Sequence, residues 1–237
     1  MSKIALQDEQ GFNQVFRPVG STPLRMRRRS DWFVSQIELL GAKRVLEIGS
    51  GTGDMAAYLA AHSSAEIVAV DISPAFVADA RARHVAPNLR FELFDLLDDA
   101  PPPFGEFDMV CGNGILHHLV MRLPQVLTSL RSLTRPGGGL AFIEPNFLNP
   151  YCAFIFGTRV GRRWARLEPD EMAFTPRELQ AALPSAGWHD VRVRTKDFLL
   201  PGLPKGLTSP ILAVEPALEA TMLTRWLAQS HFVTARA

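Results

Sequence analysis

Two adjacent histidines, His117 and His118, are the residues in this sequence best suited to acid–base chemistry. An unperturbed imidazole has a pKa of about 6.5 and can accept a proton near neutral pH. The pair follows an apolar run that predicts a buried strand, and Glu144 follows the next such run. Because the carboxyl ends of parallel strands meet at one edge of a sheet, Glu144 is positioned to orient one imidazole. Either histidine could instead pack beneath the following helix, so the sequence leaves open which of them, if either, is a base.

Glycine recurs at alternate positions, Gly49, Gly51 and Gly53, between a predicted strand and a predicted helix. Such a turn lets a ligand approach the backbone and face the amino end of the helix. The dinucleotide-binding pattern would need glycine at position 54, where Asp54 stands. Glu47, two residues before the loop, would repel a pyrophosphate and attract an ammonium or sulfonium group. NAD is therefore disfavoured as the ligand.

Two more acids end the next two predicted strands. Asp71 stands where a carboxylate can accept both hydroxyls of a ribose, and Asp95 where one can accept the exocyclic amine of adenine. A strand-end or helix-capping role would explain either acid alone. It does not explain three acids and three glycines at successive strand ends, and this combination favours one shared ligand.

The elements that must position these residues alternate as strands and helices from residue 44 onward. Strands are predicted at residues 44–48, 66–70, 89–94, 107–111, 140–143, 191–194 and 231–236. Helices are predicted at 23–40 and 54–62, after Pro74, after Pro124, after a capping box at Thr175, and around 218–226. Residues 135–138 predict a turn, and the Pro-rich run 199–216 predicts a second insert. Apolar strands separated by helices indicate an α/β fold with a parallel sheet covered on both faces.

The run VLEIGSGTGD, followed in order by VAVDIS, FDLL, FDMVCGNGILHHL and LTRPGGGLAFIEP, resembles the class I S-adenosylmethionine-dependent methyltransferases over residues 44–146. The resemblance implies a seven-stranded, doubly wound, mostly parallel sheet of order 3-2-1-4-5-7-6. It also implies S-adenosyl-L-methionine as the cofactor. The cofactor-binding residues that it implies, by position, are Glu47, Gly49, Ser50, Gly51, Gly53, Asp71, Ile72, Asp95, Leu96 and Asn113.

Outside the motifs, we expect one domain over residues 1–237, with an N-terminal helical cap at 1–41 and two lid inserts at 145–174 and 199–228. The inserts are rich in Phe and Leu, which predicts an apolar substrate pocket, with Asn146 and Tyr151 as substrate-binding candidates. A dimer interface or simple packing would explain the same apolar residues. The basic run at Arg25, Arg27, Arg28 and Arg29 is expected to form a solvated helix face, rather than to contact an anionic substrate or a membrane.

Composition restricts the partners further. The 25 Lys and Arg residues nearly balance the 24 Asp and Glu residues, which argues against nucleic acid as a partner. Residues 1–10 do not resemble a secretory signal, and no apolar run is long enough to cross a bilayer. Cys111 and Cys152 have no metal-ligand spacing, and no metal is expected. We expect a cytoplasmic protein, without stable membrane insertion, and leave a homodimer open.

These observations predict a methyltransferase of a small, apolar or aromatic molecule, acting at oxygen with a histidine as general base and Glu144 as its partner. The run Asn113-Gly114-Ile115-Leu116 lacks the Asn/Asp-Pro-Pro-aromatic motif of enzymes that methylate nucleobase amines. Two alternatives stay open: a carbon or nitrogen methyltransferase of a quinone-like or lipid acceptor, and a non-catalytic S-adenosylmethionine-binding partner subunit.

Overall fold

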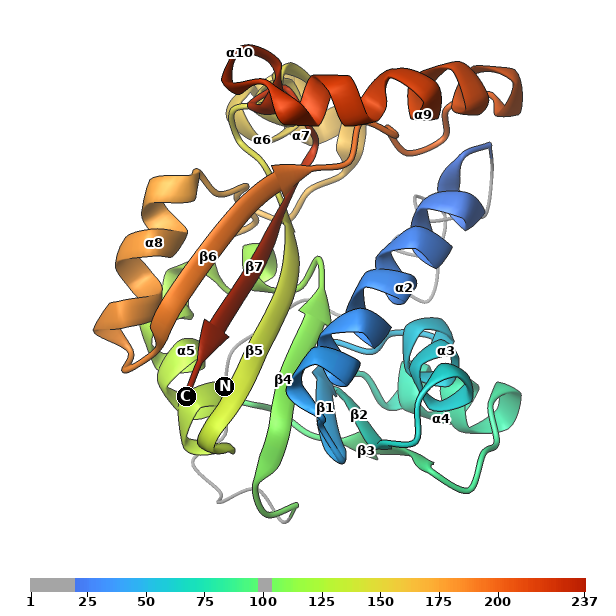
Figure 1. Ribbon diagram of the computed structural model, residues 1–237, viewed down its shortest axis with the longest axis vertical. Helices are drawn as coiled ribbons and strands as arrows, with labels where there is room; N and C mark the ends of the chain where they lie inside the picture. The colour runs from blue at the N-terminus through green and yellow to red at the C-terminus, as the bar shows by residue number, and fades with distance from the viewer. Residues whose placement is uncertain (1–19, 98–103) are drawn as a thin grey trace.

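A seven-stranded sheet forms the centre of the computed structural model, which describes residues 20–97 and 104–237 (Figure 1). The strands are β1 (Arg44–Ile48), β2 (Glu66–Asp71), β3 (Leu89–Leu93), β4 (Phe107–Asn113), β5 (Thr134–Pro145), β6 (His189–Lys196) and β7 (Ser230–Arg236). Their order is β3-β2-β1-β4-β5-β7-β6, and β7 runs antiparallel to both of its neighbours. The predicted fold class and strand order are confirmed. The first half of the predicted N-terminal cap, residues 1–19, lies outside the described residues.

Helices and single turns connect the strands. The α-helices are α2 (Thr22–Leu40), α3 (Asp54–His62), α4 (Pro74–Arg83), α5 (Leu123–Ser132), α6 (Pro150–Gly157), α7 (Arg159–Ala165), α8 (Pro176–Ser185), α9 (Lys205–Ala220) and α10 (Met222–Arg225). Two 3-10 turns, η1 (Leu116–His118) and η2 (Val120–Arg122), follow β4.

Successive residues of the central strands belong to two separate hydrophobic cores, one on each face of the sheet. In β1, Val45 packs with the inner faces of α2, α3 and α4, whereas Leu46 packs with α5 and α8. Both side chains are fully buried. The sheet is therefore covered on both faces, which is why its strands carry near-continuous apolar runs.

Helix starts follow the capping signals in the sequence. Ser73 Oγ accepts a hydrogen bond from Phe76 N at 3.3 Å, and Pro74 occupies the first helical position of α4. At α8, Thr175 and Glu178 form the predicted capping box, in which each side chain accepts from the other residue's backbone N–H.

The predicted turn at residues 135–138 is wrong, because these residues lie inside β5. Thr134 pairs with Phe107 and Gly139 pairs with Met109, so four residues of β5 lie opposite one residue of β4. Gly137 has a φ of 80°, which lets the chain bulge here without leaving the sheet.

Most of the Pro-rich run in the second insert is helical. Helix α9 begins at Lys205 and contains Pro210 and Pro216 in its interior. Each proline removes one backbone donor but leaves the helix continuous. Glu215 is the one buried side chain of α9, so most of the helix surface faces solvent.

Candidate active site

The predicted glycine turn connects the carboxyl end of β1 to α3. Gly49, Gly51 and Gly53 have φ values of 65°, 51° and 78°, which favour glycine. A Cβ on Gly49 would lie 2.5 Å from Ile115 Cδ1, so the loop after β4 packs directly on this glycine. A Cβ on Gly51 would meet nothing within 4 Å. The backbone at Gly51 therefore borders open space that a ligand can enter.

Asp71 ties this loop to the end of β2. Its Oδ2 accepts from Gly51 N at 2.8 Å and its Oδ1 accepts from Ser73 N at 2.9 Å. Each carboxylate oxygen keeps a second acceptor position, so these two bonds are compatible with ribose binding. The ribose role of Asp71 stays a prediction.

The residues predicted to surround adenine lie at the ends of β2 and β3. Asp95 is exposed, and its Oδ1 accepts from Leu97 N at 2.9 Å. Ile72 and Leu96 are half-buried, and Leu96 packs against the core on the α5 side of the sheet. Their contacts with a nucleoside also stay predictions.

Glu47 is a buried carboxyl group below the glycine loop. Burial, and then the charges of Asp71 and Asp54, raise the pKa of Glu47 to about 8. Glu47 Oε2 and Ser50 Oγ are buried without a hydrogen-bond partner among the described residues. Buried polar atoms of this kind normally have a partner, and a cation would satisfy the carboxylate. The pair therefore fits a cationic ligand better than a pyrophosphate.

Glu144 and His117 are brought together as the sequence predicted. Glu144, near the end of β5, is 1% exposed, and its Oε2 lies 3.0 Å from His117 Nδ1. The carboxylate also accepts from the backbone N–H groups of Ile115, Leu116 and His117 at 3.0, 2.8 and 3.2 Å. Because a carboxylate only accepts, we assign the ring proton to Nδ1, which leaves Nε2 as the acceptor atom of His117.

His118 lies beside His117, with the ring centroids 4.1 Å apart. Burial, assisted by His117, lowers the pKa of His118 to about 2, so this imidazole stays neutral at physiological pH. Its Nδ1 lies 3.5 Å from Glu171 Oε1, a contact that the sequence analysis missed. One donor atom each from His117, His118 and Glu171 lies within 4.8 Å of the others, a spacing that could also hold a cation. The expectation of a metal-free site stays a prediction.

The basic run on α2 is not the solvated face that the sequence predicted. Arg25 and Arg29 are each 7% exposed, and both pair with Asp197, which follows β6, at 2.9 and 3.0 Å. Arg29 Nη1 also donates to Asn113 Oδ1 at 3.0 Å. Arg28 pairs with Glu215 of α9, and Arg27 alone is exposed. The sequence does not reveal this cluster, because the shared acidic partner of Arg25 and Arg29 comes about 170 residues later in the chain.

The two substrate candidates differ in exposure. Asn146 is fully buried, and its Nδ2 donates to the backbone oxygens of Trp226 and Ala228 at 2.8 and 2.7 Å. Its Oδ1 accepts from Leu148 N, so the whole amide serves to join the two inserts. Tyr151 is half-buried and borders an apolar pocket of about 260 Å³ with Phe154, Val160 and Trp164. Substrate binding by either residue stays a prediction.

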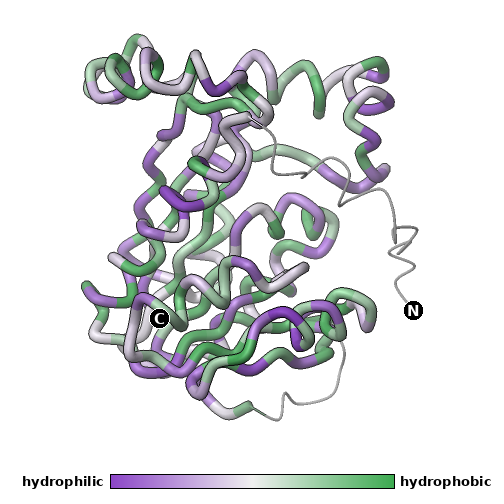
Figure 2. The backbone as a smooth tube through the Cα atoms, turned by 90° about the vertical axis from the view of Figure 1, so that its right-hand side faces the viewer, coloured by the Kyte–Doolittle hydropathy of each residue, from purple (hydrophilic) through white to green (hydrophobic). Residues whose placement is uncertain are grey.

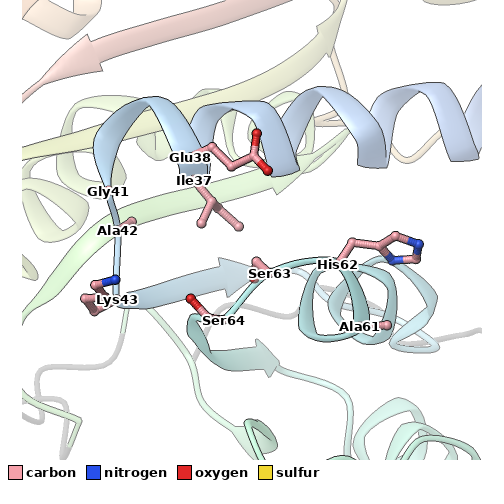
Figure 3. Close-up of a pocket in the computed structure, with 9 residues that line it drawn as sticks. All are labelled: Ile37, Glu38, Gly41, Ala42, Lys43, Ala61, His62, Ser63 and Ser64. Carbon is pink, nitrogen blue, oxygen red and sulfur yellow. The ribbon is translucent and has the colours of Figure 1, made fainter.

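A larger hollow, of about 620 Å³, lies elsewhere (Figure 3). It is lined by the end of α2, including Ile37 and Glu38, and by the end of α3, including His62 and Ser63. Gly41 to Lys43, just before β1, also border it. It therefore lies at the amino end of the parallel strands, away from the glycine loop and from His117 and His118.

Comparison with known proteins agrees with this geometry. Residues 46–140 match the family model described as a methyltransferase domain. A solved S-adenosylmethionine-dependent methyltransferase from Mesorhizobium loti superposes with a TM-score of 0.60 at 20% identity, covering 88% of this chain and 98% of that one. The central part of the chain, residues 46–140, is therefore similar to a methyltransferase domain, and the fold is that of the S-adenosylmethionine-dependent methyltransferases. The buried groups of Glu47 and Ser50 are compatible with the cationic cofactor of such enzymes.

Two further proteins are similar to this chain, one in structure and one in sequence. Human N-acetylserotonin methyltransferase, solved in complex with S-adenosylmethionine, has a TM-score of 0.57 at 18% identity, over 96% of this chain and 59% of that chain. Trans-aconitate 2-methyltransferase of Deinococcus radiodurans is 37% identical over 103 residues, which is 43% of this chain and 38% of the relative. The chain spans less than half the length of the curated relatives that it matches.

Proposed function

We propose that this protein is an S-adenosylmethionine-dependent methyltransferase, which transfers a methyl group to an oxygen of a small, apolar or aromatic acceptor with His117 as the general base. The contact between Glu144 and His117 carries the proposal. It fixes the Nδ1–H tautomer and directs Nε2 to accept a proton, as an acidic partner does in other histidine bases. His118 is the weaker candidate, because its pKa of about 2 gives it little affinity for a proton.

The chain's own residues would divide the work as follows. S-Adenosylmethionine, when bound, supplies an electrophilic methyl group. Gly51 and Asp71 would hold it at the loop after β1, and the Glu47 carboxylate would counter its positive charge. His117 Nε2 would take the proton of the acceptor hydroxyl as the oxygen attacks, and Glu144 would stabilise the resulting imidazolium.

The inserts support an apolar acceptor. Tyr151, Phe154, Val160 and Trp164 line a pocket whose surface is almost entirely apolar. Such walls with few polar groups are typical of sites for apolar small molecules. The names of the relatives, which cite N-acetylserotonin and trans-aconitate, agree with a small molecule but do not identify the acceptor of this chain.

The test is to incubate the purified protein with methyl-labelled S-adenosylmethionine and a panel of phenols, alcohols, quinones and lipids. With the acceptor found, His117→Ala should lower kcat by about 10²–10⁴ while cofactor affinity is kept. Glu144→Gln should lower kcat in the same direction, and treatment with a chelator should leave it unchanged. His189→Ala, an exposed histidine at the amino end of β6, is the matched control.

The outcomes separate the alternatives. If His117→Ala keeps parental kcat on the true acceptor, the base mechanism is wrong, and a carbon or nitrogen acceptor becomes the better account. Loss of activity with the chelator would assign a cation to His117, His118 and Glu171. Cofactor binding without turnover of any acceptor would favour the non-catalytic partner subunit.

A further inference from the structure

The two inserts form a cap that exposes many large apolar side chains. Helices α6, α7, α9 and α10 gather at the end of the molecule beyond the carboxyl ends of β4 and β5 (Figure 1). Hydrogen bonds from Asn146 and Asn149 to the backbone of residues 226–228 join the inserts. Polar and apolar segments alternate along these helices (Figure 2). The exposed apolar residues of the cap are Leu148, Phe154, Val160, Trp164, Met172, Leu207, Val214, Met222, Leu223 and Trp226.

Helix α7 combines this apolar surface with positive charge. Val160 and Trp164, one helical turn apart, are 69% and 67% exposed. Arg159 and Arg163 flank them at the same spacing, and both are exposed. Residues 146–166 contain four arginines and no acidic residue, although the chain as a whole carries a net charge of +1. The inserts also contain five acidic residues, but of these Asp170 alone is exposed, so the exposed charges of the cap are mostly positive.

Arg162, the remaining arginine of this segment, has a structural role in the cap. Arg162 turns inward and donates to the backbone oxygens of Phe156, Glu168, Pro169 and Glu171. These bonds anchor α7 to the chain that follows it. Arg159, Arg163 and Arg166 instead remain exposed around the apolar residues.

We propose that this cap docks the protein on the surface of an anionic lipid membrane. Trp, Phe and Leu side chains beside arginines are the combination that partitions into the interface of a bilayer, where apolar groups enter the acyl boundary and cations meet acidic headgroups. No helix in residues 20–97 and 104–237 is long and apolar enough to cross a bilayer, so the contact is peripheral. An acidic protein surface would meet the arginines but would leave the protruding Met222 and Leu223, 81% and 85% exposed, less well covered.

The experiment is co-sedimentation of the full chain with vesicles of phosphatidylcholine, alone or mixed with phosphatidylglycerol. Binding is expected to the anionic vesicles and to weaken with salt. Arg159→Gln with Arg163→Gln should weaken it about thirtyfold, and Val160→Ser with Trp164→Ser on the order of tenfold or more. Matched controls outside the cap are Arg192→Gln with Arg194→Gln, and Leu39→Ser with Val85→Ser, all at exposed positions.

A second readout places the contact. In a Trp226→Phe background, brominated lipid should quench fluorescence, and Trp164→Phe should remove most of that quenching. Of the two other tryptophans, Trp188 is buried in the core, and Trp32 lies on α2 outside the cap, packed against Phe33 and Phe232. Equal binding to neutral vesicles, no binding to either kind, or equal losses in the cap and control variants would each overturn the proposal. Vesicle binding needs neither cofactor nor acceptor, so its failure leaves the proposed methyl transfer standing. Val160 and Trp164 also border the apolar pocket, so the Arg159 and Arg163 variant, which leaves that pocket's lining unchanged, separates membrane binding from acceptor binding. Retained S-adenosylmethionine binding shows that each variant is folded.

Discussion

The buried carboxylate of Glu47 should make folding depend on pH. Its pKa is about 8 in the folded protein against 4.5 in the unfolded chain, so the folded state holds the extra proton between these values. The free energy of unfolding should therefore fall as pH rises from about 4.5 through 8, by up to roughly 5 kcal/mol. Denaturant titrations across this range should show the slope, and Glu47→Gln should remove it. An unchanged slope in the variant would mean that other groups cause it.

The same residue links protonation to the cofactor. A cation bound beside Glu47 favours the ionised carboxylate, so binding of S-adenosylmethionine should release a proton below pH 8. The affinity should consequently rise with pH toward 8 and then level off. Calorimetry in buffers of different ionisation enthalpy measures the proton release, and Glu47→Gln serves as the control in which it is absent.

Asp71 combines two roles that one substitution can separate. Asp71→Ala should weaken cofactor binding by about 2–3 kcal/mol. It should also lower stability by about 1–2 kcal/mol, because the N–H groups of Gly51 and Ser73 lose their acceptor. Asp71→Asn retains one acceptor oxygen and should keep more of the stability than of the affinity. If titration calorimetry gives parental affinity for both variants, Asp71 only ties the loop to β2.

At the scale of elements, Asp197 joins α2 to the end of β6. Burial alone would raise the pKa of Asp197, but the charges of Arg25 and Arg29 lower it overall. Asp197→Asn leaves two buried arginines without their counter-ion and should cost about 3–5 kcal/mol of unfolding free energy. Asp79→Asn, which breaks an exposed pair with Arg83, should cost at most about 1 kcal/mol.

The loss of unfolding free energy in Asp197→Asn should depend on pH in a defined direction. Because the folded-state pKa of Asp197 is depressed, its stabilisation is complete above the unfolded value of about 3.9 and is lost as pH falls below it. The difference between the parent and Asp197→Asn, measured by chemical denaturation, should therefore shrink in acid. A difference that persists unchanged at low pH would show that packing, rather than charge, holds α2 against β6.

At the scale of the whole molecule, the cofactor should stabilise the fold. A ligand at 100 times its Kd adds about 2.7 kcal/mol to the free energy of unfolding, so S-adenosylmethionine and its demethylated product should raise the Tm. NAD should not, because Asp71 would repel its pyrophosphate and Asp54 stands where the dinucleotide-binding pattern needs glycine. A thermal scan with the three compounds tests this. A shift with NAD alone would contradict the assignment of the cofactor.

The sequence by itself determined the parts of the site that local pattern encodes. Alternating glycines predicted the loop after β1, apolar periodicity predicted the strands, and the convergence of parallel strand ends placed Glu144 near the histidine pair. These inferences hold because a strand, its turn and the acid that ends it lie within a few residues of one another. The helix boundaries at α4 and α8 followed for the same reason, since their caps are local.

Only the tertiary structure decided which distant side chains meet. Arg29 is buried because Asp197, 168 residues later, neutralises it. His118 contacts Glu171 because the first insert folds back over η1. The side-chain amide of Asn146 donates both of its hydrogen bonds to the backbone oxygens of Trp226 and Ala228. No local periodicity encodes the path of the inserts. The burial and charge of these residues therefore depended on long-range packing, which the chain specifies only when all of its elements are assembled.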